Sequence, residues 1–308
     1  MTARENAGNF QPGYKKLYHS GELISRIKEA YRIFQKCEFC PHQCQVNRLA
    51  DERGRCGLGR EIIISGQGPH HGEEAPLSGI RGSGTIFFSG CSLSCLYCQN
   101  YDISQQKRGR QVSTREIASI MLRLQQQGCH NINLVTPTHL IYQILSALYL
   151  ACREGLNLPL VYNSSGYDSL IGLKLLDEVV DIYLPDFKYG SNKKAEKYSG
   201  IPDYFDRASQ AVKTMHSQVG LLKTDKRGIA RQGLLIRHLV LPENQAESEK
   251  IFKYIAEEIH PDSWVNIMQQ YYPAYQAHNY PELSRRLSGR EYSQALQAAR
   301  KAGLKPDN

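Results

Sequence analysis

From residue 84 onward, short apolar runs alternate with stretches whose apolar positions recur at helical spacing. The run 85–90 is almost wholly apolar and predicts a buried strand, whereas 139–155 has apolar residues every third or fourth position and predicts a helix. The alternation repeats to give six strand–helix units. The predicted strands are 85–90, 131–136, 159–166, 180–188, 233–242 and 264–270, and the predicted helices lie in 113–128, 139–155, 169–178, 203–218, 244–259 and 288–303.

Three of these helices begin with the spacing of a capping box, in which a polar N-cap side chain and a Glu three positions later satisfy each other's backbone N–H groups. The pairs are Ser113 with Glu116, Asn244 with Glu247, and Ser288 with Glu291.

The predicted strands are continuous apolar runs rather than alternating ones, which is typical of parallel strands buried on both faces. Right-handed crossovers then favour an open doubly wound sheet or a barrel. Six units are two fewer than an eightfold barrel contains. We therefore expect an α/β fold, a partial (β/α)6 barrel over residues 84–308, with its functional residues at the carboxyl ends of the strands.

Residues 1–83 do not follow this alternation. They contain one helix candidate, 21–34, followed by the stretch 36–60, which is rich in Cys, Arg and Gly. The stretch 68–84 has Gly, Pro and Ser at turn positions and predicts a connecting loop. Because so short a segment buries little apolar surface, we expect residues 1–83 to form a small cysteine-rich module stabilised by metal.

The composition is that of an ordinary soluble globular protein, with 41% hydrophobic and 22% charged residues in 308. The most apolar run, 140–152, is shorter than a membrane-spanning helix and contains Gln143. The first residues lack the apolar core of a signal peptide. We therefore expect a cytoplasmic protein that does not associate with membranes.

The formal net charge is +8, and residues 1–60 supply +5 of it, with 11 Lys and Arg against 6 Asp and Glu. Such a segment is either a solvated surface or a contact for an acidic protein or nucleic acid. No long basic run or aromatic RNA-binding pattern accompanies it, so a nucleic-acid partner is disfavoured.

Seven of the nine cysteines fall into two groups: Cys37, Cys40, Cys44 and Cys56, and then Cys91, Cys95 and Cys98. In a cytosolic chain, such groups indicate metal or redox chemistry rather than disulfides. Cys129 and Cys152 stand alone and are expected to be small buried apolar residues.

The second group supplies three thiolates within eight positions. Three thiolates suit an iron–sulfur cluster that leaves one iron open to a cofactor or substrate. The alternative is a zinc site, which needs a fourth ligand that no His or Cys within the loop supplies.

The stretch CSLSCLYC, 91–98, has an aromatic residue before its third cysteine and a predicted strand before its first. It resembles the signature of the radical S-adenosylmethionine superfamily. The longer stretch 82–104 is similar to the activating enzymes of pyruvate formate-lyase, and in particular to relatives with an N-terminal cysteine cluster. The likeness extends over about residues 30–272.

This resemblance implies that Cys91, Cys95 and Cys98 bind a [4Fe–4S] cluster, whose open iron takes the amine and carboxylate of S-adenosylmethionine. Reductive cleavage of that cofactor then gives methionine and a 5′-deoxyadenosyl radical that abstracts hydrogen. The missing fourth ligand is, on this interpretation, the cofactor itself.

Later motifs match the family in order, with one departure: LVTPTH, 134–139, stands where the family has Gly-Gly-Glu-Pro. Thr136 and Thr138 would then bind the methionine amine through hydroxyl or carbonyl oxygens. YNSSGYD, 162–168, matches a ribose-binding strand end, LPDFK, 184–188, points to Asp186 with Lys188, and MQQYYP, 268–273, points to Gln270 or Tyr271. The cofactor-binding residues implied by the resemblance are Tyr97, Thr136, Asn163, Ser165, Lys188 and Arg237.

Several of these residues also have ordinary structural alternatives. Asn163 could cap the helix that follows it. Asp186 and Lys188 could form a surface pair, and Arg237 could pair with a helix carboxylate.

The first cysteine group, Cys37, Cys40, Cys44 and Cys56, has four thiolates and can close a site. Structural zinc, a second iron–sulfur cluster and no metal at all remain open. The related branch has the same pattern, which favours a cluster that relays electrons to the open one. His42, His70 and His71 are alternative ligands or solvated loop residues.

Three functions therefore compete. The first is a radical S-adenosylmethionine enzyme that activates a glycyl-radical enzyme, with a flavodoxin-like or ferredoxin-like electron donor. The second is a radical enzyme that modifies a small molecule or another peptide, and the tyrosine-rich stretch 271–281 either packs on the open side of the barrel or contacts a peptide substrate. The third is a zinc-binding protein that binds nucleic acid.

Overall fold

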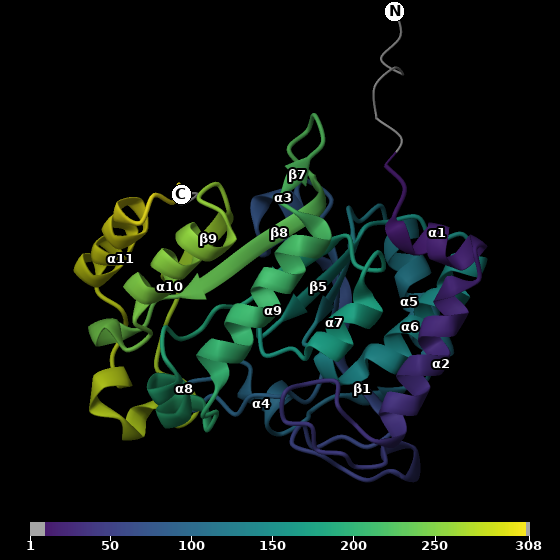
Figure 1. Cartoon of the computed structure of the whole chain (residues 1–308), viewed down its shortest axis with the longest axis horizontal. Helices are drawn as coiled ribbons and strands as arrows, with labels where there is room; N and C mark the ends of the chain where they lie inside the picture. Colours follow the sequence, from purple (N-terminus) through teal and green to yellow (C-terminus); the bar gives the residue numbers. More distant parts are fainter. Residues whose placement is uncertain (1–9, 306–308) are drawn as a thin grey trace, which may run out of the picture.

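The structure of the protein is a computed structural model that describes residues 10–305. Its centre is a nine-stranded mixed sheet with the order β3-β1-β2-β4-β5-β6-β8-β7, in which β9 also pairs with β8 (Figure 1). The strands are β1 (Ile62–His70), β2 (Ser83–Phe88), β3 (Arg110–Val112), β4 (Ile132–Val135), β5 (Leu160–Ser164), β6 (Ile182–Pro185), β7 (Lys223–Thr224), β8 (Ala230–Leu239) and β9 (Trp264–Met268).

The six predicted strands are confirmed as β2, β4, β5, β6, β8 and β9, which pair parallel in that order. The predicted α/β class is therefore confirmed. The strands β1, β3 and β7 were not predicted, and they add antiparallel pairs at the two ends of the sheet. Within residues 10–305, no pairing between β9 and the opposite end of the sheet closes a ring.

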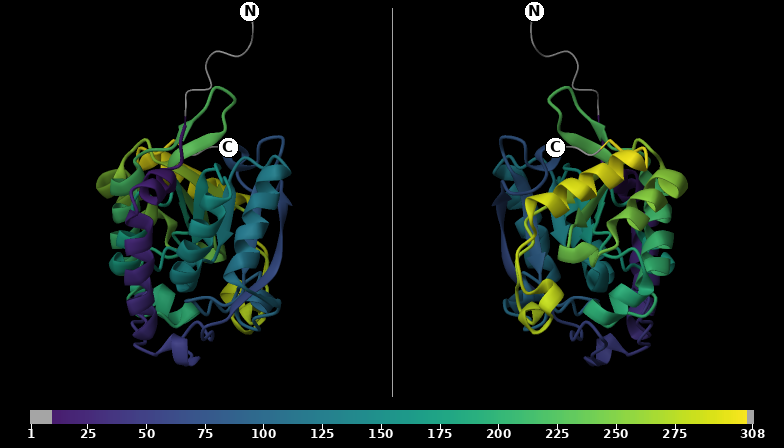
Figure 2. Two further views of the ribbon diagram at one scale, coloured as in Figure 1. Left: turned by 90° about the vertical axis from the view of Figure 1, so that its right-hand side faces the viewer. Right: turned by 90° about the vertical axis from the view of Figure 1, so that its left-hand side faces the viewer.

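Helices cover the outer face of the sheet, where one large apolar cluster joins them to alternate strand residues such as Ile132, Leu160 and Ile236. The helices are α1 (Gly13–His19), α2 (Glu22–Gln35), α3 (Ala75–Ser78), α4 (Tyr101–Ser104), α5 (Thr114–Gln126), α6 (Ile141–Arg153), α7 (Leu170–Leu176), α8 (Asn192–Ser199), α9 (Tyr204–Val219), α10 (Ser248–Tyr254) and α11 (Gly289–Lys301). Figure 2 shows α2 and α11 on opposite sides of the molecule. In residues 10–305 no helix is long and apolar enough to cross a membrane.

The capping boxes at Ser113 and Ser288 are confirmed. The one predicted at Asn244 with Glu247 is wrong, because Glu247 has a left-handed backbone with φ 53° and α10 begins only at Ser248. Asn244 instead accepts a hydrogen bond from the Ser248 backbone N–H at 3.1 Å.

The inner face of the sheet carries a second, smaller apolar cluster. Val161, Ile182, Leu184 and Leu235 project there from successive strands, and Leu77 of α3 packs against them. Since side chains alternate between the two faces of a strand, the next inward positions toward the carboxyl ends are Asn163, Asp186 and Arg237. The inner face is thus apolar at one end and polar at the other.

The prediction of a loop over residues 68–84 is wrong in part. Residues 68–70 belong to β1, which pairs antiparallel with β2 from Ile64 opposite Phe88 to His70 opposite Ser83. Backbone pairing does not depend on apolar side chains. Because β1 is rich in Gly and ends in Pro-His, the pattern of apolar residues did not predict it as a strand. The helix predicted over 21–34 is confirmed as α2.

The cysteine-rich stretch lies at the same end of the molecule as the carboxyl ends of the strands. Figure 1 shows the segment 36–61 with α4 and α8 along the lower edge of the view, whereas α3 and β7 lie at the upper edge. The helix α2, from the predicted N-terminal module, packs into the main apolar cluster through residues such as Leu23 and Phe34. The boundary at residue 83 stays a prediction.

Candidate functional site

The second cysteine group lies directly after the carboxyl end of β2. This strand ends at Phe88, and Cys91, Cys95 and Cys98 follow on a loop that runs to α4. We refer to residues 89–98 as the thiol loop. Cys95 is buried, and Cys91 and Cys98 are half-buried, so the loop presents sulfur atoms at the end of the sheet where ligands bind in parallel α/β folds.

Each of the three thiols also contacts a hydrogen-bonding group. The contacts are Leu93 N–H to Cys91 Sγ at 3.3 Å, Ser199 Oγ–H to Cys95 Sγ at 3.0 Å, and Ser104 Oγ with Cys98 Sγ at 3.2 Å. Hydrogen bonds to sulfur are one of the means by which a protein tunes an iron–sulfur cluster.

The three thiols share one electrostatic environment. Burial raises the pKa of Cys91 to about 12, and Cys95 and Cys98 contribute in the same direction. Within residues 10–305, no three Cys, His, Asp or Glu side chains are gathered to hold a single metal ion. A set of three thiols with a fourth position open fits an iron–sulfur cluster that takes a further ligand.

A polar network occupies the neighbouring strand ends and joins three of the predicted site residues. Lys188 Nζ lies 2.7 Å from Asp186 Oδ2, and Arg237 Nε lies 2.9 Å from Asp186 Oδ1. Arg237 Nη2 also donates to Asn163 Oδ1 at 2.7 Å, and its Nη1 lies 3.7 Å from Glu73 Oε2. Asp186 therefore joins Lys188 to Arg237, and Arg237 joins Asn163 to this pair.

The charges in this network stabilise one another. Burial alone would raise the pKa of Asp186, but Arg237 and Lys188 hold it below its ordinary value. Burial disfavours the Lys188 ammonium, yet Asp186 followed by Cys95 raises the pKa of Lys188 above its usual range. Lys188 thus links the network to the thiol loop electrostatically.

This arrangement replaces the structural alternatives for these residues. Asn163 does not cap the next helix, because Ser169 caps α7 by accepting from Gly172 N–H. Asp186 and Lys188 are not a solvated surface pair, since each side chain is only 19% exposed.

Two other predicted residues contribute backbone rather than side-chain contacts. Thr136 follows β4 with φ 58°, and its N–H donates to Asn163 O at 2.8 Å. The Ser165 carbonyl accepts from the Tyr204 hydroxyl at 2.8 Å. Thr136 is half-buried and Ser165 is 9% exposed, so both lie at the same strand ends as the network.

Tyr97 is buried in an aromatic group behind the thiol loop. It packs edge-on against Tyr189 and Tyr271, with ring centroids 6.2 and 6.0 Å away. The segment 271–281 packs beside this loop, since Gln276 N–H donates to Leu96 O at 2.8 Å.

Sequence reasoning missed a buried carboxylate, Asp168, which organises the ends of β4 and β5. It accepts hydrogen bonds from Thr138 at 2.7 Å, Tyr162 at 2.9 Å and Ser164 at 2.6 Å. The Thr138 hydroxyl is therefore already used. The signal was available, because Asp168 lies in the quoted motif YNSSGYD together with Tyr162 and Ser164, whereas Thr138 is 30 residues away in sequence.

A second missed group faces the inside of the sheet between β1 and β9. Glu73 and Glu74 follow β1, and Glu74 Oε1 accepts from Asn266 of β9 at 2.9 Å. Glu74 Oε2 has no hydrogen-bond partner among the described residues, and the same holds for both side-chain atoms of fully buried Asn133. Buried polar atoms without partners indicate a place for water or a ligand group.

The first cysteine group lies against the thiol loop. Cys37, Cys40 and Cys56 are buried and Cys44 is half-buried. His42, between two of these cysteines, has its Nε2 2.8 Å from Ser92 O. The lone Cys129 and Cys152 are buried in the main core, 3% and 7% exposed, as predicted.

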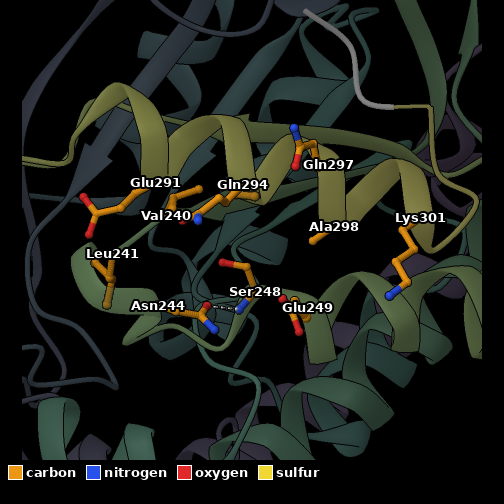
Figure 3. Close-up of a pocket in the computed structure, with 11 residues that line it drawn as sticks. Val240, Leu241, Asn244, Ser248, Glu249, Glu291, Gln294, Gln297, Ala298 and Lys301 are labelled. Atoms are coloured by element: carbon orange, nitrogen blue, oxygen red, sulfur yellow. Dashed lines mark hydrogen bonds between the residues drawn. The ribbon is translucent and has the colours of Figure 1, made fainter.

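A cavity of about 350 Å³ lies elsewhere, between α10 and α11 (Figure 3). Polar side chains line much of it, including Asn244, Glu249 and Lys301. It contains none of the predicted site residues, so we do not place the chemistry there.

The chain belongs to the radical SAM superfamily, whose family model matches residues 85–255. This match includes the thiol loop and the network at Asn163, Asp186 and Arg237. The chain is therefore a radical SAM enzyme, a class that uses a [4Fe–4S] cluster and S-adenosylmethionine.

A curated relative, the uncharacterized protein MJ0674 of Methanocaldococcus jannaschii, is 36% identical over 292 residues, which cover 92% of this chain and 79% of the relative. Among solved structures, SuiB of Streptococcus suis bound to the precursor peptide SuiA is 14% identical, with a TM-score of 0.48 over 70% of this chain. A radical SAM methyltransferase from Sphaerobacter thermophilus is 13% identical, with a TM-score of 0.46 over 71% of this chain. The matched part spans 46% of SuiB and 65% of the methyltransferase.

Proposed function

We propose that this enzyme abstracts a hydrogen atom from a peptide or protein substrate, as expected of an activating enzyme for a glycyl-radical enzyme. The observation that carries the proposal is the three-thiol loop at the carboxyl end of β2, next to the network of Asp186, Lys188 and Arg237. When bound there, the cluster and S-adenosylmethionine together supply the carbon-centred radical that removes the hydrogen atom.

In this proposal the chain's own residues hold the cofactor in one orientation. Arg237 binds the cofactor carboxylate with the N–H groups that Asp186 and Asn163 leave free, because a guanidinium has five donors in a fixed plane. Asn163 and Ser165 lie at the end of β5 for the ribose, and Thr136 offers its carbonyl and hydroxyl to the amine. Asp186 orients Arg237 and Lys188, so it is a positioning residue.

A peptide substrate is supported by the surface beside the thiol loop. Tyr272 and Tyr275 are each 39% exposed, which is unusual for so large a side chain. Tyr275 stacks on Tyr101, with ring centroids 5.0 Å apart, and Tyr101 lies three residues after Cys98. Exposed tyrosines bind peptide segments well, since each has a large apolar ring and a polar hydroxyl.

The test is anaerobic reconstitution with iron and sulfide, followed by reduction with dithionite or with a flavodoxin-like or ferredoxin-like donor. We expect 5′-deoxyadenosine to form, and a glycyl-radical doublet to appear in electron paramagnetic resonance when a glycyl-radical enzyme is added. Deoxyadenosine without the doublet would reject the activating role, and no deoxyadenosine in an iron-loaded enzyme would reject the cofactor assignment.

A second candidate function, modification of a small molecule, is favoured by one observation. Asn133 and Glu74 offer unpartnered polar atoms on the inner side of the sheet, where a small substrate could bind. A deuterated cell extract, divided by molecular mass into two fractions and offered to the enzyme, distinguishes the two candidate functions. Deuterium in 5′-deoxyadenosine from the macromolecular fraction supports the peptide substrate, and deuterium from the low-mass fraction supports the small molecule.

A further inference from the structure

Arg48 is a fully buried arginine in the N-terminal cysteine segment, by which we mean residues 36–61. It opens the short 3-10 helix Arg48–Ala50 and is 0% exposed. Its Nε donates to Gly59 O at 2.9 Å, its Nη1 donates to His139 O, and its guanidinium lies 4.5 Å from the centre of the Phe34 ring. Its Nη2 has no hydrogen-bond partner among the described residues.

No carboxylate neutralises this guanidinium in the part of the chain that the structure describes. Three of the four acidic residues of the same segment have other partners: Glu61 pairs with Arg53 at 3.4 Å, Asp51 accepts from Arg60 N–H at 3.1 Å, and Glu52 accepts from Asn47 N–H at 2.7 Å. A guanidinium keeps its charge in proteins, and burying an unpaired charge costs several kcal/mol. A buried anion beside Arg48 is therefore expected.

Thiols are the groups next to Arg48 that can supply that charge. Cys37 N–H donates to Val46 O at 3.1 Å and Gln45 N–H donates to Cys37 O at 3.0 Å, so the chain folds back and places Cys37 beside the turn that carries Cys44. Burial raises the pKa of Cys37, and the nearby Arg48 guanidinium opposes that rise. Three of the four thiols are at most 9% exposed. Cys44 is held by a hydrogen bond from Arg55 N–H at 3.3 Å, and a side chain at Gly54 would come within 2.9 Å of its sulfur.

We propose that Cys37, Cys40, Cys44 and Cys56 bind one metal centre as thiolates, and that the buried Arg48 balances the negative charge of this centre. Within residues 10–305 these thiols are not gathered closely enough to hold a single ion, so the centre is an iron–sulfur cluster, and four thiolates around such a cluster give it a net negative charge. The proposal is independent of the reaction at the thiol loop, because it rests on the charge of a different arginine and on different thiols.

The proposed centre lies directly against the thiol loop. The Ser92 carbonyl can only accept, so His42 carries its proton on Nε2 and donates it over 2.8 Å. Gly90 has φ 83°, and a Cβ there would lie 3.1 Å from Cys56 O. The metal centre thus orders the surface on which the thiol loop rests.

The first experiment removes the other metal site. The full chain with Cys91, Cys95 and Cys98 replaced by Ala is purified anaerobically, and its iron, sulfide and zinc are counted. We expect about one iron–sulfur cluster per chain, found as iron together with sulfide. A folded triple variant without iron and sulfide, whether it is empty or contains zinc, overturns the proposal, whatever the activity of the unmodified enzyme.

The second experiment tests the role of Arg48. We expect Arg48→Met to lose the metal to a chelator about 10–100-fold faster, since loss of an outer contact to a metal site has effects of this size on affinity. Arg53→Met is the matched control, because Arg53 is in the same segment but its side chain is 58% exposed, and its rate should not change.

If Arg48→Met does not fold, Arg48→Lys replaces it in the same assay, because it keeps the charge but not the planar donors. We expect its loss rate to fall between those of the unmodified chain and of a Cys40→Ser variant. A rate equal to that of the unmodified chain for folded Arg48→Met, or equal to that of Cys40→Ser for Arg48→Lys, would overturn the charge-balancing role.

Discussion

Both cysteine groups offer sulfur as the ligand atom, and their segments contact each other through His42 and the Ser92 carbonyl. The charged residues beside the two groups differ. The N-terminal cysteine segment contains one buried arginine, Arg48, that no carboxylate pairs with among the described residues, and Arg48 acts on the thiol of Cys37. The three thiols of the thiol loop lie beside Lys188, which Asp186 already neutralises at 2.7 Å.

This difference separates a closed site from an open one. A lone buried cation is stabilised by an anion in the same place, and in our proposal the thiols of the N-terminal cysteine segment provide it. A cation that is already paired leaves its remaining donors for an incoming ligand. The proposal for each group thus agrees with its number of cysteines and with the state of the neighbouring cation.

Replacing Cys95 with Ala should give the largest effect, because it removes one of only three thiols in the open site. We expect formation of 5′-deoxyadenosine to fall by more than about 100-fold, which exceeds the usual cost of losing an outer contact to a metal. The fold should persist, since the thiol loop follows a strand that is paired on both sides. Deoxyadenosine assays and circular dichroism measure the two outcomes.

Cys129→Ala is the control for this variant, as Cys129 is also buried but belongs to neither group. It should retain cofactor cleavage. Global unfolding of Cys95→Ala, or cleavage at the unmodified rate, would contradict the assignment of the thiol loop.

Replacing Arg237 with Gln should give the next largest effect. It leaves the buried Asp186 carboxylate with one cation fewer, and breaking a buried pair in this way costs about 3–5 kcal/mol. Arg231→Gln is the matched control on the same strand, because Arg231 pairs with Asp225 at 2.8 Å but is 29% exposed. Loss of that pair should cost at most about 1 kcal/mol.

Urea unfolding of both arginine variants, with and without S-adenosylmethionine, measures this difference. The unmodified protein and Arg231→Gln should gain stability from the cofactor, and Arg237→Gln should gain little. Equal stabilisation of all three proteins would show that Arg237 does not bind the cofactor.

Much of the fold could be predicted from sequence because the parallel strands are nearly continuous apolar runs. The strand 160–164, which is buried at every position, and the strand 264–268, which is buried at alternate positions, lie close to their predicted limits. The strand β1 could not be predicted in this way, since its pairing with β2 uses backbone groups and its sequence includes Gly66, Gly68 and Pro69. The cap predicted at Asn244 is wrong because Glu247 has a left-handed backbone and itself occupies the N-cap position, so that the helix begins at Ser248.

The residues of the candidate site likewise divide into those that the sequence could predict and those that it could not. Asn163, Asp186 and Arg237 follow predicted strands, and parallel strands bring their carboxyl ends to one edge, so their meeting could be expected. Glu73 reaches Arg237 only because the segment after β1 crosses to the far end of the sheet. The burial of Arg48 could not be predicted from the sequence, because one arginine within a basic segment is indistinguishable from a surface residue.

Replacing Cys40 with Ala tests the N-terminal cysteine segment in the same way as Cys95→Ala tests the thiol loop. We expect residues 36–61 to become sensitive to protease while the sheet remains folded, because the segment contains little regular structure of its own. The loss of stability should be about 1–3 kcal/mol if the metal is the main constraint. Limited proteolysis with mass spectrometry locates the cuts.

Cys152→Ala serves as the control, since Cys152 packs in the main core from α6 and belongs to neither cysteine group. It should not expose the segment 36–61 to protease. Unchanged protease sensitivity in Cys40→Ala would argue that these thiols do not hold the segment together.

Acidification should give the smallest of these effects, and it should act on the sheet beside the open site rather than on the N-terminal cysteine segment. His238 is 0% exposed, and burial lowers its pKa from 6.5 to about 4. Below pH 6.5 the unfolded chain therefore binds a proton at His238, whereas the folded chain does not bind one until the pH approaches 4. The stability that neutral His238 contributes is thus present above pH 6.5 and is lost as the pH falls toward 4. At pH 5 this loss amounts to about 2 kcal/mol.

His238→Gln should flatten the dependence of the free energy of unfolding on pH between 7 and 5, whereas His278→Gln, at an exposed position, should not. The comparison must be made between variants, because burial raises the pKa of Asp181 to about 7 and thereby adds stability as the pH falls. Urea unfolding at the two pH values measures the slope. If His238→Gln and the unmodified protein have the same slope, then burial does not keep this imidazole neutral against the hydrogen bond from His238 Nδ1 to Phe187 O at 2.7 Å, which raises its pKa, and the strand that carries Arg237 is less well shielded from water than its burial indicates.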